Sequence, residues 1–236
     1  MSHFLPVVTL DGPAGVGKTT LARRIAENLD LPYLDSGAMF RCLALNLGRD
    51  AESLPENELR ARCAQWTFTL AGKGRKSVLL CNDQAVGDEV RTEHVGMLAA
   101  RIATVPAVRE ILRAVQRAIG EKSPLVAEGR DMGTVVFPEA RFKFFLDALP
   151  EVRAARRLRE LEERGENAEL ADLTEQIRKR DALDRNRAVA PLRPARDACV
   201  VDTSRLDIQG VLGVMLHHIS LHGGRHALAA GMPSAL

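Results

Sequence analysis

The sequence has little excess of either charge, no long apolar run and few cysteines. Its 236 residues contain 33 Lys and Arg against 31 Asp and Glu, so no general field attracts nucleic acid or an anionic membrane surface. No apolar run approaches the roughly 20 residues that span a bilayer. The four cysteines show no CxxC or zinc-type spacing, which is typical of buried thiols in a reducing cytoplasm. We therefore expect a cytoplasmic protein with neither a membrane nor a nucleic-acid partner.

The first twelve residues also lack the basic segment and the apolar length of a signal peptide. What is present is an ordinary globular composition, 46% hydrophobic and 27% charged, over a length that can bury a substantial core. Five short apolar segments, four of which end in a carboxylate, are separated by helical patterns: 6–11, 32–35, 125–129, 142–147 and 199–202. This alternation predicts an α/β fold with a five-stranded, buried parallel sheet flanked by helices.

Two segments depart from the alternation. Residues 67–90 resemble two β-segments around the Gly-rich turn AGKGRK, which predicts a small antiparallel β insertion. Residues 151–187 carry ten basic and ten acidic side chains, which is typical of a solvated helix pair with i,i+4 ion pairs. That pattern explains the arginines at the two ends of the segment less well than those in its middle.

Four of the six histidines follow Leu216. His218 and His222 have a spacing that can bind a metal, but glycines follow at once and no carboxylate is near, so a frayed tail is the favoured interpretation. Truncation after about Gly223 is expected to change activity little.

Residues 11–20, DGPAGVGKTT, follow the first apolar segment and precede an amphipathic helical pattern. Gly12, Gly17, Lys18 and Thr19 match G-x-x-x-x-G-K-[ST]. The glycines let backbone N–H groups surround phosphate oxygens, and the helix points its positive end at the same place. The lysine reaches the β- and γ-phosphates, and the threonine hydroxyl binds Mg²⁺. We predict a nucleoside triphosphate site, here called the P-loop, formed by Gly12, Pro13, Ala14, Gly15, Val16, Gly17, Lys18, Thr19 and Thr20.

The P-loop does not say where the phosphoryl group goes. The guanine-reading NKxD and the DxxG of GTPases are absent from the expected places, whereas a kinase needs a second anion site made of arginines. Such side chains, together with carboxylates, follow the predicted strands or stand in helical patterns: Asp35, Ser36, Arg41, Arg109, Glu128, Arg130, Asp131, Arg180, Asp184 and Arg187. A small-molecule kinase is therefore favoured over a nucleotide-binding switch protein, which stays the alternative from another class.

The segments DGPAGVGKTT, LDSGAMFR, VRTEHV, AEGRDMGTVVFPEA, FFLDA and KRDALDRNRAVAPL together resemble bacterial cytidylate kinases, members of the nucleoside monophosphate kinase family. The resemblance runs from about residue 7 to 203. It implies ATP as phosphoryl donor with Mg²⁺, and CMP or dCMP as acceptor, although UMP, AMP or shikimate remain alternative acceptors. It also implies one kinase domain, which we expect to be a monomer, with a core of about 1–40, 105–150 and 188–220, a monophosphate-binding part of about 41–104, and a helical lid of about 151–187.

The resemblance assigns roles residue by residue. Arg41, Arg130 and Arg180 would surround the monophosphate, beside Asp35 and Ser36. Arg109, Asp131 and Arg187 would face the cytosine, and Asp184 the sugar hydroxyls. The residues expected to act on the transferring phosphoryl group are Lys18, Arg130, Arg156, Arg157 and Arg180, and Arg153 is a further lid arginine that the resemblance places over the same group. Family members often carry a base-contacting serine where this chain has Ala100.

Overall fold

A computed structural model describes residues 6–223, in which a five-stranded parallel sheet has the strand order β2-β6-β1-β7-β8. All four neighbouring pairs are parallel. The strands are β1 (Val7–Asp11), β2 (Tyr33–Asp35), β6 (Leu125–Gly129), β7 (Phe142–Asp147) and β8 (Cys199–Asp202). Each lies in a segment where the sequence predicts a strand, so the predicted parallel sheet is confirmed.

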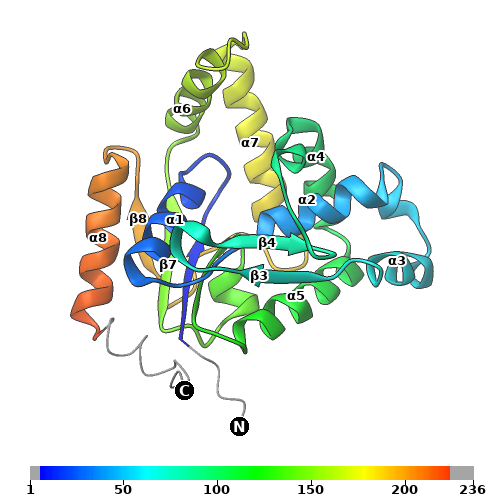
Figure 1. The fold of residues 1–236 in the computed structure, drawn as a ribbon. Helices are drawn as coiled ribbons and strands as arrows, with labels where there is room; N and C mark the ends of the chain where they lie inside the picture. The colour runs from blue at the N-terminus through cyan, green and yellow to red at the C-terminus, as the bar shows by residue number, and fades with distance from the viewer. Residues whose placement is uncertain (1–5, 224–236) are drawn as a thin grey trace.

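Helices cover both faces of this sheet because its side chains alternate between two apolar clusters. Val8 and Leu10 of β1 pack with α1 (Lys18–Leu29) and α8 (Ile208–Leu221). Val7, on the opposite face, joins the cluster of α2 (Ser36–Leu47), α4 (Glu93–Ile102) and α5 (Pro106–Gly120). Figure 1 shows α8 on one side of the molecule and α2 to α5 on the other. The remaining short helices are η1 (Ala51–Ser53), α3 (Glu56–Cys63), η2 (Gly74–Lys76), η3 (Asp88–Arg91) and the single π-helical turn η4 (Met132–Val136).

Two details of the sheets differ from expectation. The predicted burial is wrong for β8, where Val200 is 59% exposed, because β8 is the edge strand and only β7 pairs with it. The insertion has a third strand besides β3 (Phe68–Ala71) and β4 (Val78–Cys81), namely β5 (Gln84–Ala85), which is exposed and too short to show a periodicity. Such short exposed strands carry no hydrophobic signal.

The expected frayed tail is wrong for its first residues. Helix α8 continues to Leu221, since Ile219 is buried and the His218 ring stands edge-on to Phe144 with centroids 5.4 Å apart. Residues 224–236, which the truncation after about Gly223 would remove, lie outside the described part of the chain. Within residues 6–223, no helix has both the length and the apolarity to cross a membrane.

Helices α6 (Pro150–Glu162) and α7 (Leu170–Asn186) form the predicted helix pair, a hairpin that projects above the sheet. Its base is held by Arg153, which is 1% exposed. The Arg153 guanidinium pairs with Asp181 of α7 and donates to the Ala14 carbonyl of the P-loop, 3.1 Å away. One buried cation therefore joins both hairpin helices to the P-loop.

Gly12→Ala is expected to destabilise the protein by more than about 2 kcal/mol, as substitutions that force backbone strain do. Gly12 has a φ of +152°, and an added Cβ would lie 2.2 Å from the Leu146 carbonyl oxygen. Thermal unfolding measures the effect. Gly213→Ala is the control, because that exposed helical position has open space around the added methyl and gains about 1 kcal/mol in helix propensity. Equal melting temperatures for both variants would contradict the close packing at Gly12.

Candidate functional site

The P-loop connects β1 to α1 in a conformation that only glycines adopt easily. Gly15 and Gly17 have φ values of +73° and +91°, a left-handed region that costs other residues free energy. Gly17 is also the N-cap of α1, and no side chain caps the helix there. The first N–H groups of α1 therefore remain available to an anion at the positive end of the helix.

Lys18 lies inside this loop rather than in solvent. Its side chain is 7% exposed, and its ammonium group donates to the Pro13 carbonyl at 2.7 Å. Burial and the nearby Arg130 charge hold the pKa of Lys18 well below its usual value, although the charges of Glu128 and Asp184 act to raise it. A bound polyphosphate would offset this loss, because an adjacent anion favours the charged ammonium.

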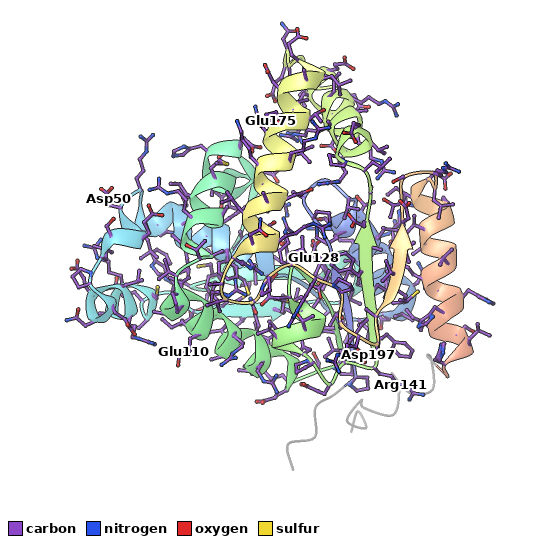
Figure 2. The ribbon with its side chains drawn as sticks, turned by 180° about the vertical axis from the view of Figure 1, so that it is seen from behind. Asp50, Glu110, Glu128, Arg141, Glu175 and Asp197 are labelled. Atoms are coloured by element: carbon purple, nitrogen blue, oxygen red, sulfur yellow. The ribbon has the colours of Figure 1, made fainter. Side chains whose placement is uncertain are left out.

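Glu128 faces Lys18 from the end of β6. It is 4% exposed and accepts a hydrogen bond from the Tyr33 hydroxyl of β2. Burial and the Asp35 charge raise the pKa of Glu128, whereas Lys18, Tyr33 and a hydrogen bond with Thr19 lower it. Figure 2 shows Glu128 in the middle of the molecule, while Glu175 lies far from it on the projecting hairpin. A buried carboxylate and a threonine hydroxyl thus meet beside the P-loop lysine.

Three arginines from different elements converge on the same region. The Arg130 Nε donates to Asp184 Oδ2 of α7 at 2.7 Å. Arg180 lies beside Gly96 of α4, and no hydrogen bond or ion pair engages it within residues 6–223. Burial and the charges of Arg130 and Arg41 lower its pKa to about 10, with Asp184 and Glu93 opposing. Because Arg180 is a largely buried cation beside two other arginines and has no paired carboxylate within residues 6–223, the cluster is suited to bind an anion such as a phosphate.

A second group of buried charges centres on Asp131. One of its carboxylate oxygens accepts from Arg109 of α5, and the other lies 3.5 Å from Arg187 Nη2. That Nη2 atom is buried and has no hydrogen-bond partner among residues 6–223. Asp35 Oδ2 is similarly orphaned, 3.6 Å from Arg91. Buried polar atoms without partners are rare, so these two atoms indicate that a polar ligand completes the site.

The structure does not bring every expected side chain to these groups. Arg156 points to the end of β8, where it donates to the backbone carbonyl and hydroxyl of Thr203. Arg157 pairs with Glu160 of its own helix. Ser36 donates to the Glu128 carbonyl at 2.7 Å, so its hydroxyl packs against β6. Thr20, beside the P-loop lysine and threonine in sequence, is exposed.

Sequence reasoning missed three contributors: Tyr33, Arg91 and Asp11. Tyr33 is the first residue of β2, and the sequence indicates it only as part of an apolar strand. Arg91 is exposed and stands in VRTEHV, a segment that supports only the resemblance. Asp11 begins the quoted P-loop stretch, but its partners are the N–H groups of Met132 and Gly133, more than 120 residues later. No local pattern could have identified those partners, because they depend on the pairing of β1 with β6.

Comparisons with known proteins agree with one another over most of the chain. A profile of the cytidylate kinase family matches residues 8–221. A cytidylate kinase of Nitratidesulfovibrio vulgaris (strain Hildenborough) is 62% identical over 220 residues, 93% of this chain and 95% of that protein. Cytidylate kinases of Oleidesulfovibrio alaskensis and Vibrio parahaemolyticus are 55% and 45% identical, over 89% and 93% of this chain and 96% and 97% of theirs. A solved shikimate kinase from Bacteroides thetaiotaomicron is 14% identical with a TM-score of 0.44, covering 92% of this chain and 98% of its own. The profile and the identities, not the structural likeness, show that the chain belongs to the cytidylate kinase family.

Proposed function

We propose that the chain transfers the γ-phosphoryl group of ATP to CMP or dCMP, giving ADP and CDP or dCDP. The observation that carries this proposal is the pairing of two anion sites in one buried cluster. Lys18 and the P-loop form one site, Arg41 and Arg180 the other, and Arg130 is electrostatically coupled to both. Membership of the cytidylate kinase family supports the identity of the acceptor.

The donor side consists of the P-loop residues, with Lys18 at the β- and γ-phosphates. A magnesium ion prefers oxygen ligands and binds through few protein groups. The Thr19 hydroxyl and the Glu128 carboxylate, which adjoin each other beside Lys18, fit that preference. The metal, when bound, neutralises charge on the phosphates. Tyr33, through its hydrogen bond to Glu128, holds that carboxylate in place.

The acceptor side divides between phosphate and base. Arg41, Arg130 and Arg180 bind the monophosphate, and Asp184 orients Arg130 through the hydrogen bond described above. Asp184 keeps a low pKa although burial would raise it, because Arg130 and Arg180 adjoin it. It therefore stays ionised and can also accept from a sugar hydroxyl.

For the base, the Asp131 carboxylate accepts from the cytosine N4 amino group. Arg109 and Arg187, both already directed at Asp131, donate to the ring's N3 and O2. The orphaned Arg187 Nη2 supports this role. Asp35, the N-cap of α2, also contacts the acceptor nucleotide, and Ser36 contributes beside it although its hydroxyl donates to the Glu128 carbonyl.

Chemistry at this site needs no general base. The acceptor phosphate has a second pKa of about 6 and is already largely ionised at pH 7. Catalysis is then positioning and charge stabilisation by Lys18 and the arginines. The enzyme must also exclude water, and we assign that task to the α6–α7 hairpin as a lid of about residues 151–187.

Closure of the lid would be required to bring Arg156 and Arg157 to the reacting phosphate, because their present partners lie elsewhere. The core of about 1–40, 105–150 and 188–220 and the monophosphate-binding part of about 41–104 complete the proposed division. We further propose that the protein works as a monomer in the cytoplasm.

An acceptor panel tests the function. ADP formation from ATP and Mg²⁺ is measured with CMP, dCMP, UMP, AMP and shikimate, and with no acceptor. We expect CMP and dCMP to give the highest kcat/KM and the blank to give little ADP. Faster turnover with another acceptor would contradict the proposed substrate. Slow hydrolysis that no acceptor accelerates would instead favour the nucleotide-binding switch.

The same assay tests base recognition. Asp131→Ala is expected to narrow the CMP/UMP ratio of kcat/KM by roughly tenfold or more, because loss of the acceptor for N4 removes discrimination worth about 1–3 kcal/mol. Ala100→Ser is the comparison variant, and it should change the ratio less, since Asp131 is retained. An unchanged ratio in Asp131→Ala removes this residue from base recognition.

Arg130→Ala and Arg180→Ala are each expected to weaken CMP binding by about 10- to 150-fold, the equivalent of roughly 1.5–3 kcal/mol for a charge-assisted hydrogen bond. Binding of an ATP analogue should weaken much less. Calorimetric titration with each ligand separates the two effects. Arg178→Ala is the control on the same helix, because its pair with Glu151 is exposed and contributes little. Equal losses for both ligands would place the two arginines outside the acceptor site.

A further inference from the structure

Asp11, the last residue of β1, is a buried carboxylate that the proposed mechanism does not use. It is 4% exposed. Its two oxygens accept separate hydrogen bonds from the backbone N–H groups of Met132 and Gly133, at 2.8 and 2.7 Å. Asp11 also directly precedes Gly12, where the P-loop begins. One side chain thus joins the donor loop to the segment that follows β6.

That segment, residues 129–133, is the turn that carries Arg130 and Asp131. It packs closely on its surroundings: a Cβ on Gly129 would lie 2.6 Å from Ser36 Oγ, and one on Gly133 would lie 2.9 Å from Thr9 Oγ1. Met132 begins the π-helical turn η4. A single π-helical turn is rare and has little stability by itself. The orientation of the turn therefore depends on what holds its first N–H groups.

Holding an ionised carboxylate here is costly to the fold. Burial, with a contribution from the Asp131 charge, raises the pKa of Asp11 from 3.8 to about 7, although the two N–H groups and Lys18 oppose the shift. Arg130 also faces this carboxylate. Between about pH 4 and 7 the folded chain binds a proton at Asp11 that the unfolded chain does not, so this group favours folding more at pH 5.5 than at pH 8. An amide of the same shape would avoid that cost.

We propose that Asp11 is a positioning residue, which fixes the turn of residues 129–133 and thereby the Arg130 and Asp131 side chains relative to the P-loop. It touches no reacting atom. Two N–H groups held by two oxygens of one carboxylate define both the position and the direction of the turn, which an amide with a single oxygen does not. The effect on turnover rests on the proposed function, whereas the effect on the turn does not.

The test compares Asp11→Asn with Thr9→Val. Thr9 is the matched control, since it is fully buried on the same strand, beside the same turn, and its hydroxyl has no hydrogen-bond partner. Hydrogen exchange without any nucleotide is measured first. We expect the amides of residues 130–136 to exchange at least about tenfold faster in Asp11→Asn and at nearly the wild-type rate in Thr9→Val. Unchanged protection in Asp11→Asn overturns the proposal.

Activity is then measured at pH 8, and the melting temperature is measured at pH 5.5 and at pH 8. We expect kcat/KM for CMP to fall about tenfold or more in Asp11→Asn. We also expect the melting temperature of the variant minus that of the wild type to be larger at pH 8 than at pH 5.5. A merely structural role predicts a lower melting temperature at both pH values with normal kcat/KM in the folded variant, and that result overturns the proposal. If exchange changes as expected but the wild-type protein does not phosphorylate CMP, the proposed function fails and the positioning role of Asp11 stands.

Discussion

Cationic side chains buried beside one another are the constraint on which the site depends. Arg130 is paired with Asp184 and Lys18 faces Glu128, whereas Arg180 makes no hydrogen bond or ion pair within residues 6–223. The pKa values of Arg180 and Lys18 are both lowered, because burial and neighbouring cations disfavour the charged forms of these side chains. A bound phosphate would offset this unfavourable free energy, because an adjacent anion favours the charged forms of the two side chains. A cluster of this kind is suited to bind the phosphate groups that a phosphoryl-transfer reaction requires.

The parallel sheet brings this cluster together. The carboxyl ends of β1, β2 and β6 meet at one edge, which places the P-loop, the start of α2 and the turn after β6 beside one another. Helix α7 adds Arg180 and Asp184 from above, and Arg153 fixes the base of that helix to the P-loop. The carboxylates contact these groups: Asp184 pairs with Arg130, Asp131 pairs with Arg109, and Asp11 accepts hydrogen bonds from the turn after β6.

Those features that depend on a local sequence pattern could be predicted from the sequence alone. The apolar segments predicted all five parallel strands, and the glycine spacing located the P-loop before any geometry was known. The rest depends on which segments become neighbours. The exposure of Val200 follows from the strand order, and the bond from Tyr33 to Glu128 joins residues 95 positions apart. Arg156 shows the same limit: its lid position implied the phosphate, yet the folded chain directs it to Thr203.

Calorimetric titration of the wild-type protein with CMP and with cytidine tests the central claim most directly, because the two ligands differ only in the phosphate. In the proposed site, Arg41, Arg130 and Arg180 form charge-assisted hydrogen bonds with the phosphate of CMP, which cytidine lacks, and each bond contributes roughly 1.5–3 kcal/mol. We predict that CMP binds at least about 100-fold more tightly than cytidine, and that added salt narrows this difference in affinity. Equal affinities would contradict it, since the buried arginines would then serve no phosphate.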